Sequence, residues 1–136
     1  MIDEAEQQEV YRIASEFFLE TTGSEEEAQG MLANLANIVQ EQGTKLVHLG
    51  NVLFLILVRA EGVVEVHVIG KEDSPQTLAN DFMQLAAYLK GIGVKYAYAY
   101  VEDDRFDKIR EMVPVDVQKQ QVDVGGKMLN VYAVEL

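Results

Sequence analysis

The sequence predicts a mixed α+β fold, with helices flanking a mostly antiparallel sheet and elements in the order α-α-β-β-β-α-β-α-β-β. Two periodicities predict it: apolar residues recur at helical spacing in the first third of the chain and at the two-residue period of strands after residue 44. Length is the third observation, since 136 residues supply one self-sufficient core and too little chain for two full domains. We expect a single domain over 1–136, with an acidic helical part at 1–43 and the sheet core at 44–136.

Two helices are expected in the first part. Apolar residues at helical spacing run through residues 3–21, and Thr22-Gly23 ends the pattern. Ser24 and Glu27 have the spacing of a capping box, which begins a second helix that extends to about Gln42. Residues 1–43 hold ten carboxylates and only one basic residue, Arg12. We read the run of acids at 25–27 as a solvated helix start rather than as a docking surface for a basic partner.

An antiparallel meander is expected next. Residues 46–48 form a short candidate strand, 51–59 a long one and 63–69 a third, with Glu61-Gly62 as the tight turn between the last two. The run 52–58 is apolar at both alternating positions, which predicts a strand covered on both faces.

The second half of the chain alternates helices and strands. Ser74 as N-cap and Pro75 at the first helical position predict a third helix through Leu89, which ends at Gly91 or Gly93. A short helix over 105–112, with Phe106, Ile109 and Met112 inward, follows the next strand. Strands at 115–118, 121–124 and 128–134 complete the chain, with Gly125-Gly126 as a hairpin turn.

The strand at 95–101 has one bulky and one thin face. Tyr96, Tyr98 and Tyr100 share one side, and Ala97, Ala99 and Val101 share the other. The thin side lets a helix approach closely. Tyrosines are enriched at contact surfaces, so the bulky side is open to three interpretations: a core beneath the N-terminal helices, a ligand groove or a partner interface.

From about residue 45 onward, the succession resembles the GNAT superfamily of acyl-CoA N-acyltransferases. The match is one of topology and spacing over roughly two-thirds of the chain. The matching segments are the strand 63–69, the helix 78–89 with its glycine exit, the strand 96–101, the acidic turn and short helix 102–112, and the hairpin through Gly125-Gly126. The resemblance implies a GNAT-like sheet and acetyl-CoA as the acyl donor. Short proteins of this pattern also occur in bacteriophage genomes, which implies a phage-encoded divergent member.

Glu65 and His67 are the candidate catalytic residues. Both lie on one face of the strand 63–69, because strand side chains alternate. In an acyltransferase, either side chain can take a proton from an amine. The alternative interpretation is a polar strand face in solvent or under a loop. Neither His67 nor His48 belongs to a metal-ligand pattern, so we expect no metal site.

The loop after this strand is the candidate cofactor site. The resemblance places the diphosphate of acetyl-CoA at the helix start, with these residues as its contacts: Ile69, Gly70, Lys71, Ser74, Gln76 and Thr77. Here, however, Glu72 and Asp73 add two negative charges, and Pro75 lacks the N–H that a diphosphate needs. The short helix 105–112 also lacks the tyrosine that the family often uses to reprotonate the leaving thiolate. We therefore expect no bound cofactor.

Charge and composition exclude further classes. The chain has 23 acidic against 11 basic residues, a formal charge of −12 that disfavours a nucleic-acid partner. It has no cysteine, which excludes disulfides, thiolate metal sites and a thiol nucleophile. No stretch approaches the ~20 apolar residues of a membrane span, and no leader pattern opens the chain.

From these observations we expect a soluble, non-catalytic interaction or structural protein. Its setting would be the cytoplasm, either the host cytoplasm or a virion if the chain is phage-encoded as a virion or accessory component. Its partner would be another protein or a second copy of itself, with no nucleic acid or membrane partner. The alternative is an active acetyl-CoA-dependent N-acetyltransferase that acts on a small amine or a protein amine.

Overall fold

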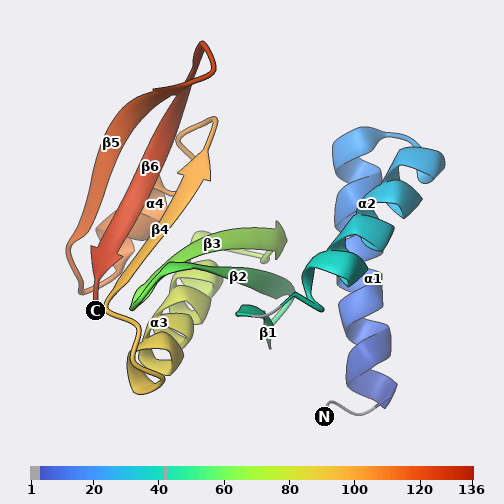
Figure 1. Cartoon of the computed structure of the whole chain (residues 1–136), viewed down its shortest axis with the longest axis horizontal. Helices are drawn as coiled ribbons and strands as arrows, with labels where there is room; N and C mark the ends of the chain where they lie inside the picture. The colour runs from blue at the N-terminus through green and yellow to red at the C-terminus, as the bar shows by residue number, and fades with distance from the viewer. Residues whose placement is uncertain (1–3, 42) are drawn as a thin grey trace.

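The computed structural model describes residues 4–41 and 43–136, so the expected helix positions at Asp3 and Gln42 lie outside it. The order of elements agrees with the prediction (Figure 1). The helices and strands are α1 Glu4–Thr22, α2 Glu25–Ile38, β1 Thr44–Leu49, β2 Val52–Ala60, β3 Val63–Gly70, α3 Pro75–Gly91, β4 Tyr96–Val101, α4 Asp107–Met112, β5 Val117–Val124 and β6 Lys127–Glu135.

The sheet has six strands in the order β1-β2-β3-β4-β6-β5. Every neighbouring pair is antiparallel except β3 and β4, which run parallel. These two strands pair over only three positions, the last of which joins Glu65 to Tyr98. Beyond that point β3 and β4 diverge, and the sheet opens into two wings (Figure 1). The first wing consists of β1, β2 and β3, and the second of β4, β6 and β5. No helix in the described residues is long and apolar enough to cross a membrane.

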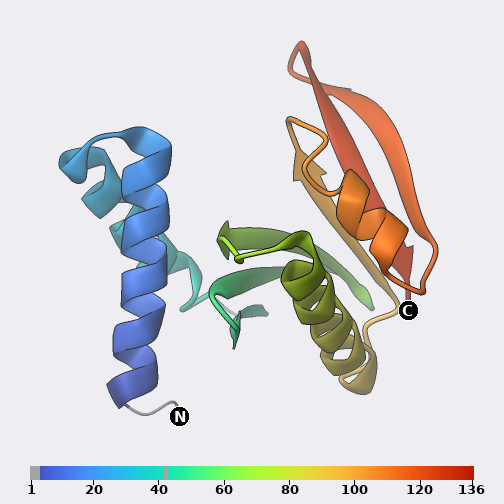
Figure 2. The same ribbon diagram turned by 180° about the vertical axis from the view of Figure 1, so that it is seen from behind.

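Helices cover both faces of the first wing (Figures 1 and 2). Alternate residues of β2 divide between two cores: Leu53 and Leu55 face α1 and α2, whereas Phe54 and Ile56 face α3. Residues 52–56 are buried, which confirms the two-sided cover predicted for this strand. The prediction was wrong at Val58, which is 53% exposed, because the cover does not reach the end of the strand.

Helix α4 lies on the same side of the sheet as α3, over the second wing (Figure 2). A row of rings in edge-to-face contact joins the two helices to the sheet: Phe54, Phe82, Phe106 and Tyr132, with centroids 5.3, 5.4 and 5.6 Å apart along the row. This row fills the inner side of the opening between β3 and β4, together with Val68 and Val101.

Two predictions about the C-terminal part need correction. Residues 115–118 and 121–124 do not form separate strands, because β5 pairs with β6 continuously from Val117 to Val124. The polar residues in the middle of β5 interrupt its apolar pattern, but they leave its hydrogen-bond pairing with β6 intact. An edge strand tolerates such residues because part of it faces solvent. Met112 is 43% exposed, not inward: the inward positions of α4 follow the spacing 106, 109 and 113, which turns Met112 away.

Candidate functional site

Polar side chains gather where β3 and β4 begin to diverge, on the face that is turned toward α1. The Glu65 carboxylate accepts a hydrogen bond from Arg59 Nε at 3.0 Å, and His67 Nε2 lies 2.6 Å from its other oxygen. Glu65 is only 9% exposed, whereas the side chains of Arg59 and His67 are 49% and 44% exposed. The structure therefore brings both candidate catalytic residues together, as predicted, around a nearly buried carboxylate.

Arg59 and Tyr98 complete this cluster; the sequence analysis missed Arg59 and named Tyr98 only as one of the three tyrosines on its strand. Arg59 lies where the β2–β3 register shifts between Val58 and Ala60. The hydrogen bond with Glu65 raises the pKa of Arg59, which keeps the guanidinium charged. Burial, and then the Glu65 carboxylate, raise the pKa of Tyr98, so its hydroxyl keeps its proton near neutral pH. One signal in the sequence could have found Arg59. It lies across the β2–β3 hairpin from Glu65, and a carboxylate on a strand face is often paired with a basic residue of the neighbouring strand.

The tyrosines of β4 extend this polar cluster into an open row. The ring centroids of Tyr96 and Tyr98 lie 6.4 Å apart, and those of Tyr98 and Tyr100 lie 5.5 Å apart at 86°. Tyr96 and Tyr100 are each 41% exposed. Helices α1 and α2 stand beside β1–β3 and do not cover β4 (Figure 1). The interpretation that the N-terminal helices bury the tyrosines is therefore wrong, and the groove and interface interpretations remain.

The cluster is suited to proton transfer and to cation binding. Histidine is the side chain that most often serves as a general base, and a carboxylate hydrogen-bonded to its ring orients it. The exposed edge of His67 faces the same open side as the tyrosine row, whose ring faces attract ammonium or guanidinium groups.

The candidate cofactor residues are held by contacts within the chain. Ile69 points into the core with α1 rather than toward the loop. Gly70 has φ +106°, and a Cβ there would lie 2.7 Å from Asn51 O, so only glycine fits. Lys71 Nζ forms an ion pair with Glu20 of α1. At the start of α3, Gln76 Nε2 donates to Asn80.

The N–H groups at this helix start are largely used. Ser74 Oγ accepts from Thr77 N at 3.2 Å, and Ser74 O accepts from Leu78 N at 3.2 Å. Pro75, at the first helical position, has no N–H. An anion site at a helix N-terminus depends on free donors of this kind.

Two carboxyl groups meet on the inner side of the same loop. Glu72 Oε2 accepts from Asn51 N at 3.2 Å, and the Glu72 carboxyl interacts with that of Asp81, which is 4% exposed and whose Oδ2 has no hydrogen-bond partner among the described residues. Burial first, and then Glu72, raise the pKa of Asp81 to about 7. The pair lies against Gly50 in the β1–β2 turn, where a Cβ would meet Glu72 Oε2 at 2.2 Å. Below that pH the pair shares a proton.

The residues present do not fit the diphosphate of coenzyme A. The exposed charge that remains at the loop is that of Asp73, because Lys71 is engaged by Glu20 and Glu72 by Asn51; both acids are repulsive to a diphosphate. The donor groups are few, since Pro75 supplies none and Ser74 occupies that of Thr77. In residues 4–41 and 43–136, no group of three or more metal-ligating side chains lies close enough to hold a metal ion.

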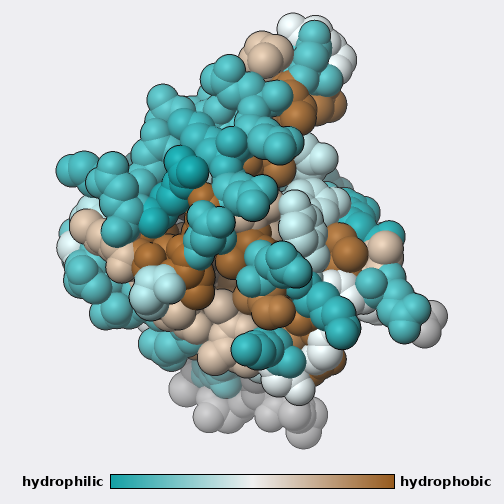
Figure 3. All heavy atoms as spheres, turned by 90° about the vertical axis from the view of Figure 1, so that its left-hand side faces the viewer, coloured by the Kyte–Doolittle hydropathy of each residue, from teal (hydrophilic) through white to brown (hydrophobic). Residues whose placement is uncertain are grey.

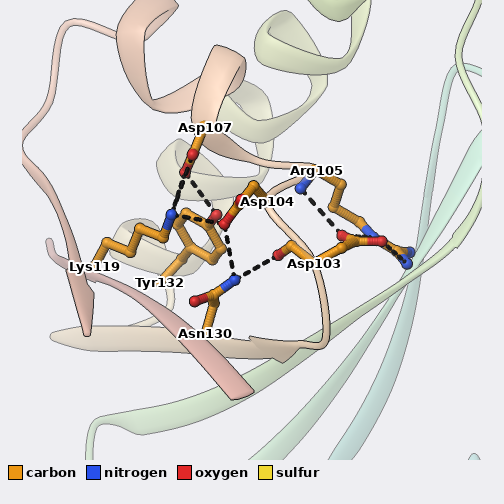
Figure 4. A network of polar contacts seen from close by, with 7 residues as sticks. All are labelled: Asp103, Asp104, Arg105, Asp107, Lys119, Asn130 and Tyr132. Carbon is orange, nitrogen blue, oxygen red and sulfur yellow. Dashed lines mark hydrogen bonds and ion pairs between the residues drawn. The ribbon is translucent and has the colours of Figure 1, made fainter. Parts of the chain in front are cut away.

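A second polar network fastens α4 to the sheet (Figure 4). Tyr132 of β6 donates to Asp107 at 2.7 Å, and Lys119 of β5 bridges Asp104 and Asp107 at 2.9 and 3.0 Å. Asn130 donates to the backbone O of Asp103 at 2.7 Å. Burial raises the pKa of Tyr132 to about 12, so it stays a donor.

The network supplies a tyrosine beside α4 that the sequence analysis did not foresee. Residues 105–112 contain none, but β6 brings Tyr132 to the first turn of this helix. Its hydroxyl is occupied by Asp107, and the residue is 5% exposed. These contacts indicate a structural role, because the hydroxyl of Tyr132 is bonded to Asp107, and Asp107 is paired in turn with Lys119.

Comparisons with known proteins support the fold. No family model and no curated protein match the sequence. Among solved structures, a probable GNAT-family acetyltransferase from Chromobacterium violaceum is similar at TM-score 0.58 and 12% identity, covering 82% of this chain and 68% of that one. The IAA acetyltransferase of Bacillus cereus gives 0.57 and 13%, covering 91% and 93%. An N-acyl amino acid synthase from uncultured soil microbes gives 0.59 and 15%, covering 98% and 88%. The protein therefore has the fold of the GNAT acyltransferase superfamily.

Proposed function

We propose that the protein is a non-catalytic binding protein built on the GNAT fold, which acts through a protein partner or a second copy of itself. The observation that carries this proposal is the misfit between the β3–α3 loop and a diphosphate. A fold does not carry its chemistry with it, so the loop residues decide the matter. We extend the proposal to a setting in the cytoplasm or a virion, as a phage accessory component.

Charge at the loop supports this proposal in physical terms. Residues 70–77 hold one basic and two acidic residues, so the segment has a formal charge of −1. Lys71 is engaged by Glu20, and Glu72 is held by Asn51 and Asp81. A diphosphate seated there would face two carboxylates, and it would find few free amide donors to compensate for its lost water.

Isothermal titration with acetyl-CoA and with free coenzyme A tests the proposal. We expect no saturable heat up to millimolar ligand for the natural chain. In a double variant, Asp73→Asn with Pro75→Ala, the loop loses one negative charge and regains one N–H, so we expect measurable binding to appear. Micromolar affinity of the natural chain for acetyl-CoA, with acylation of any amine, would contradict the proposal.

A specific observation favours a second candidate, an acetyl-CoA-dependent N-acetyltransferase acting on a small amine or a protein amine. The Glu65–His67 pair stands on the open face with Arg59 against the same carboxylate. In that function His67 accepts a proton from the substrate ammonium, which frees the neutral amine to attack the thioester carbonyl. The C–N bond forms as the C–S bond breaks, coenzyme A leaves as the thiolate, and Glu65 holds the imidazolium, which returns the proton to that thiolate. General bases contribute about 10²–10⁴-fold, so His67→Gln would lower turnover at least a hundredfold, and Glu65→Gln, which removes only the group that holds the imidazolium, would lower it less. Glu61→Gln, in the exposed turn at the far end of β3, is the matched control.

The surface that we propose for the partner is the tyrosine row. Tyrosine gives large contact area with little loss of rotamer freedom, and Tyr96 and Tyr100 are partly exposed. Sedimentation velocity across a concentration series tests the self-association form of the proposal. We expect Tyr96→Ala with Tyr100→Ala to shift any dimer toward monomer, whereas Tyr88→Ala, on α3, would leave it unchanged.

A further inference from the structure

A cavity opens between α3 and α4, on the face of the sheet opposite Glu65 and His67. Its volume is about 110 Å³. Apolar side chains from both helices and from strands β4, β5 and β6 line it, among them Leu85, Ala86, Ala99, Ile109, Val117 and Val134. Figure 3, which views the molecule from the side where β5 lies in Figure 1, shows hydrophobic surface gathered between hydrophilic side chains.

The cavity exists because the residues of β4 that face the two helices are small. The inner face of β4 carries Ala97 and Ala99, which are too small to fill the space beneath the two helices, and Ala86 of α3 adds no bulk above them. The cavity is open to solvent on one side, but its apolar lining offers water no hydrogen-bond partner, so hydrocarbon that displaces water from it is favoured. The chemistry of the lining therefore selects an apolar group.

The rim of the cavity carries an arginine for which the described residues supply no ion pair, although the charge of Asp107, one turn earlier on α4, acts on it. Arg12, Arg59 and Arg105 each form an ion pair with a carboxylate. Arg110, the fourth arginine, lines the cavity, and its Nε donates to Val117 O. Among residues 4–41 and 43–136, no acidic side chain lies within ion-pair distance of it. Its guanidinium is exposed and still has donors to offer.

We propose that this cavity binds a short aliphatic carboxylate, with the hydrocarbon tail between α3 and α4 and the carboxylate on Arg110. A cavity of about 150 Å³ takes benzene, so by proportion 110 Å³ takes a tail of about four to five carbons. A carboxylate head matches the planar fork of a guanidinium, which binds it through two parallel hydrogen bonds. Hexanoate satisfies both requirements.

Titrations followed by two-dimensional NMR test the proposal with three matched probes. Hexanoate has the tail and the anionic head, pentylamine has the same tail with a cationic head, and acetate has the head without the tail. We expect hexanoate to bind at least tenfold more tightly than either of the others. Methyl signals of Leu85, Ile109 and Val134 should shift, whereas those of Leu53 and Leu55, in the core under α1, should not.

Variants separate the tail from the head. Arg110→Gln should weaken hexanoate binding roughly fivefold, the effect of one exposed ion pair, while Lys108→Gln on the same short helix makes an equal charge change and should have no effect. Ala86→Leu fills the cavity and should abolish the methyl shifts. The proposal is overturned if pentylamine binds as well as hexanoate, if the shifts lie outside the cavity, or if folded Ala86→Leu binds hexanoate like the natural chain.

Discussion

The buried carboxyl pair of Glu72 and Asp81 makes the stability of the protein depend on pH in an unusual direction. Burial and Glu72 raise the pKa of Asp81 from 3.8 to about 7, so the folded state holds a proton that the unfolded chain releases near pH 4. Stability is therefore fully present below pH 4 and is lost as the pH rises toward 7. The substitution Asp81→Asn removes this dependence, because an amide donates to Glu72 without a proton from solution.

The expected size follows from that pKa. Each pH unit between the two pKa values changes the free energy of unfolding by about 1.4 kcal/mol. Between pH 4.5 and 7 the natural chain thus loses about 3 kcal/mol that Asp81→Asn retains. Urea unfolding followed by circular dichroism at a series of pH values from 4.5 to 8.5 measures the difference between the two proteins.

Comparison with Asp81→Asn isolates the pair from other groups that titrate in the same range. His48, whose ring contacts Gly50 O, is present in both proteins. Asp73→Asn, an exposed acid of the same loop, is the matched control and should follow the natural chain. If the unfolding free energies of natural protein and Asp81→Asn run parallel from pH 4.5 to 8.5, the shared proton does not exist and the reasoning fails.

Three further predictions concern packing. Gly50→Ala should cost about 1 kcal/mol more than Gly23→Ala in urea unfolding, because both have positive φ but only Gly50 lies against the carboxyl pair; equal costs would contradict that contact. Tyr132→Phe should cost about 1–2 kcal/mol through the lost hydrogen bond to α4, and a neutral result would mean that the bond is not formed. Phe106→Ala should cost about 3–4 kcal/mol, against under ~1 kcal/mol for exposed Met112→Ala; similar values would place Phe106 outside the core.

Much of the fold is readable from local patterns. The caps at Ser24 and Ser74 begin helices where predicted, since each side-chain oxygen accepts from the N–H three residues on. The turns at Glu61-Gly62 and Gly125-Gly126 are two-residue hairpin loops, because the strand partners flank them directly. These caps and turns depend only on residues that are close together in the chain, so local sequence patterns predict them well.

The site is less readable, because long-range pairing creates it. Alternation along β3 placed Glu65 beside His67, but only the β2–β3 register brings Arg59 to the same carboxylate. From its sequence context, Asp81 would be expected to be an ordinary polar residue on the surface of a helix. No pattern in the neighbouring residues predicts that it is buried beside Glu72. The role of Tyr132 likewise depends on which strand lies under α4.

The short parallel pairing of β3 with β4 leaves the sheet with two additional edges inside the molecule. Past Glu65 and Tyr98, each strand keeps a neighbour on one side only. Exposed strand edges recruit other chains, but here a plug of aromatic rings, with Phe82 and Phe106 at its centre, stands in front of the gap. The angle between the two halves is thus set by side-chain volume rather than by the backbone ladder, and anything that enters the gap from that side must first displace a ring.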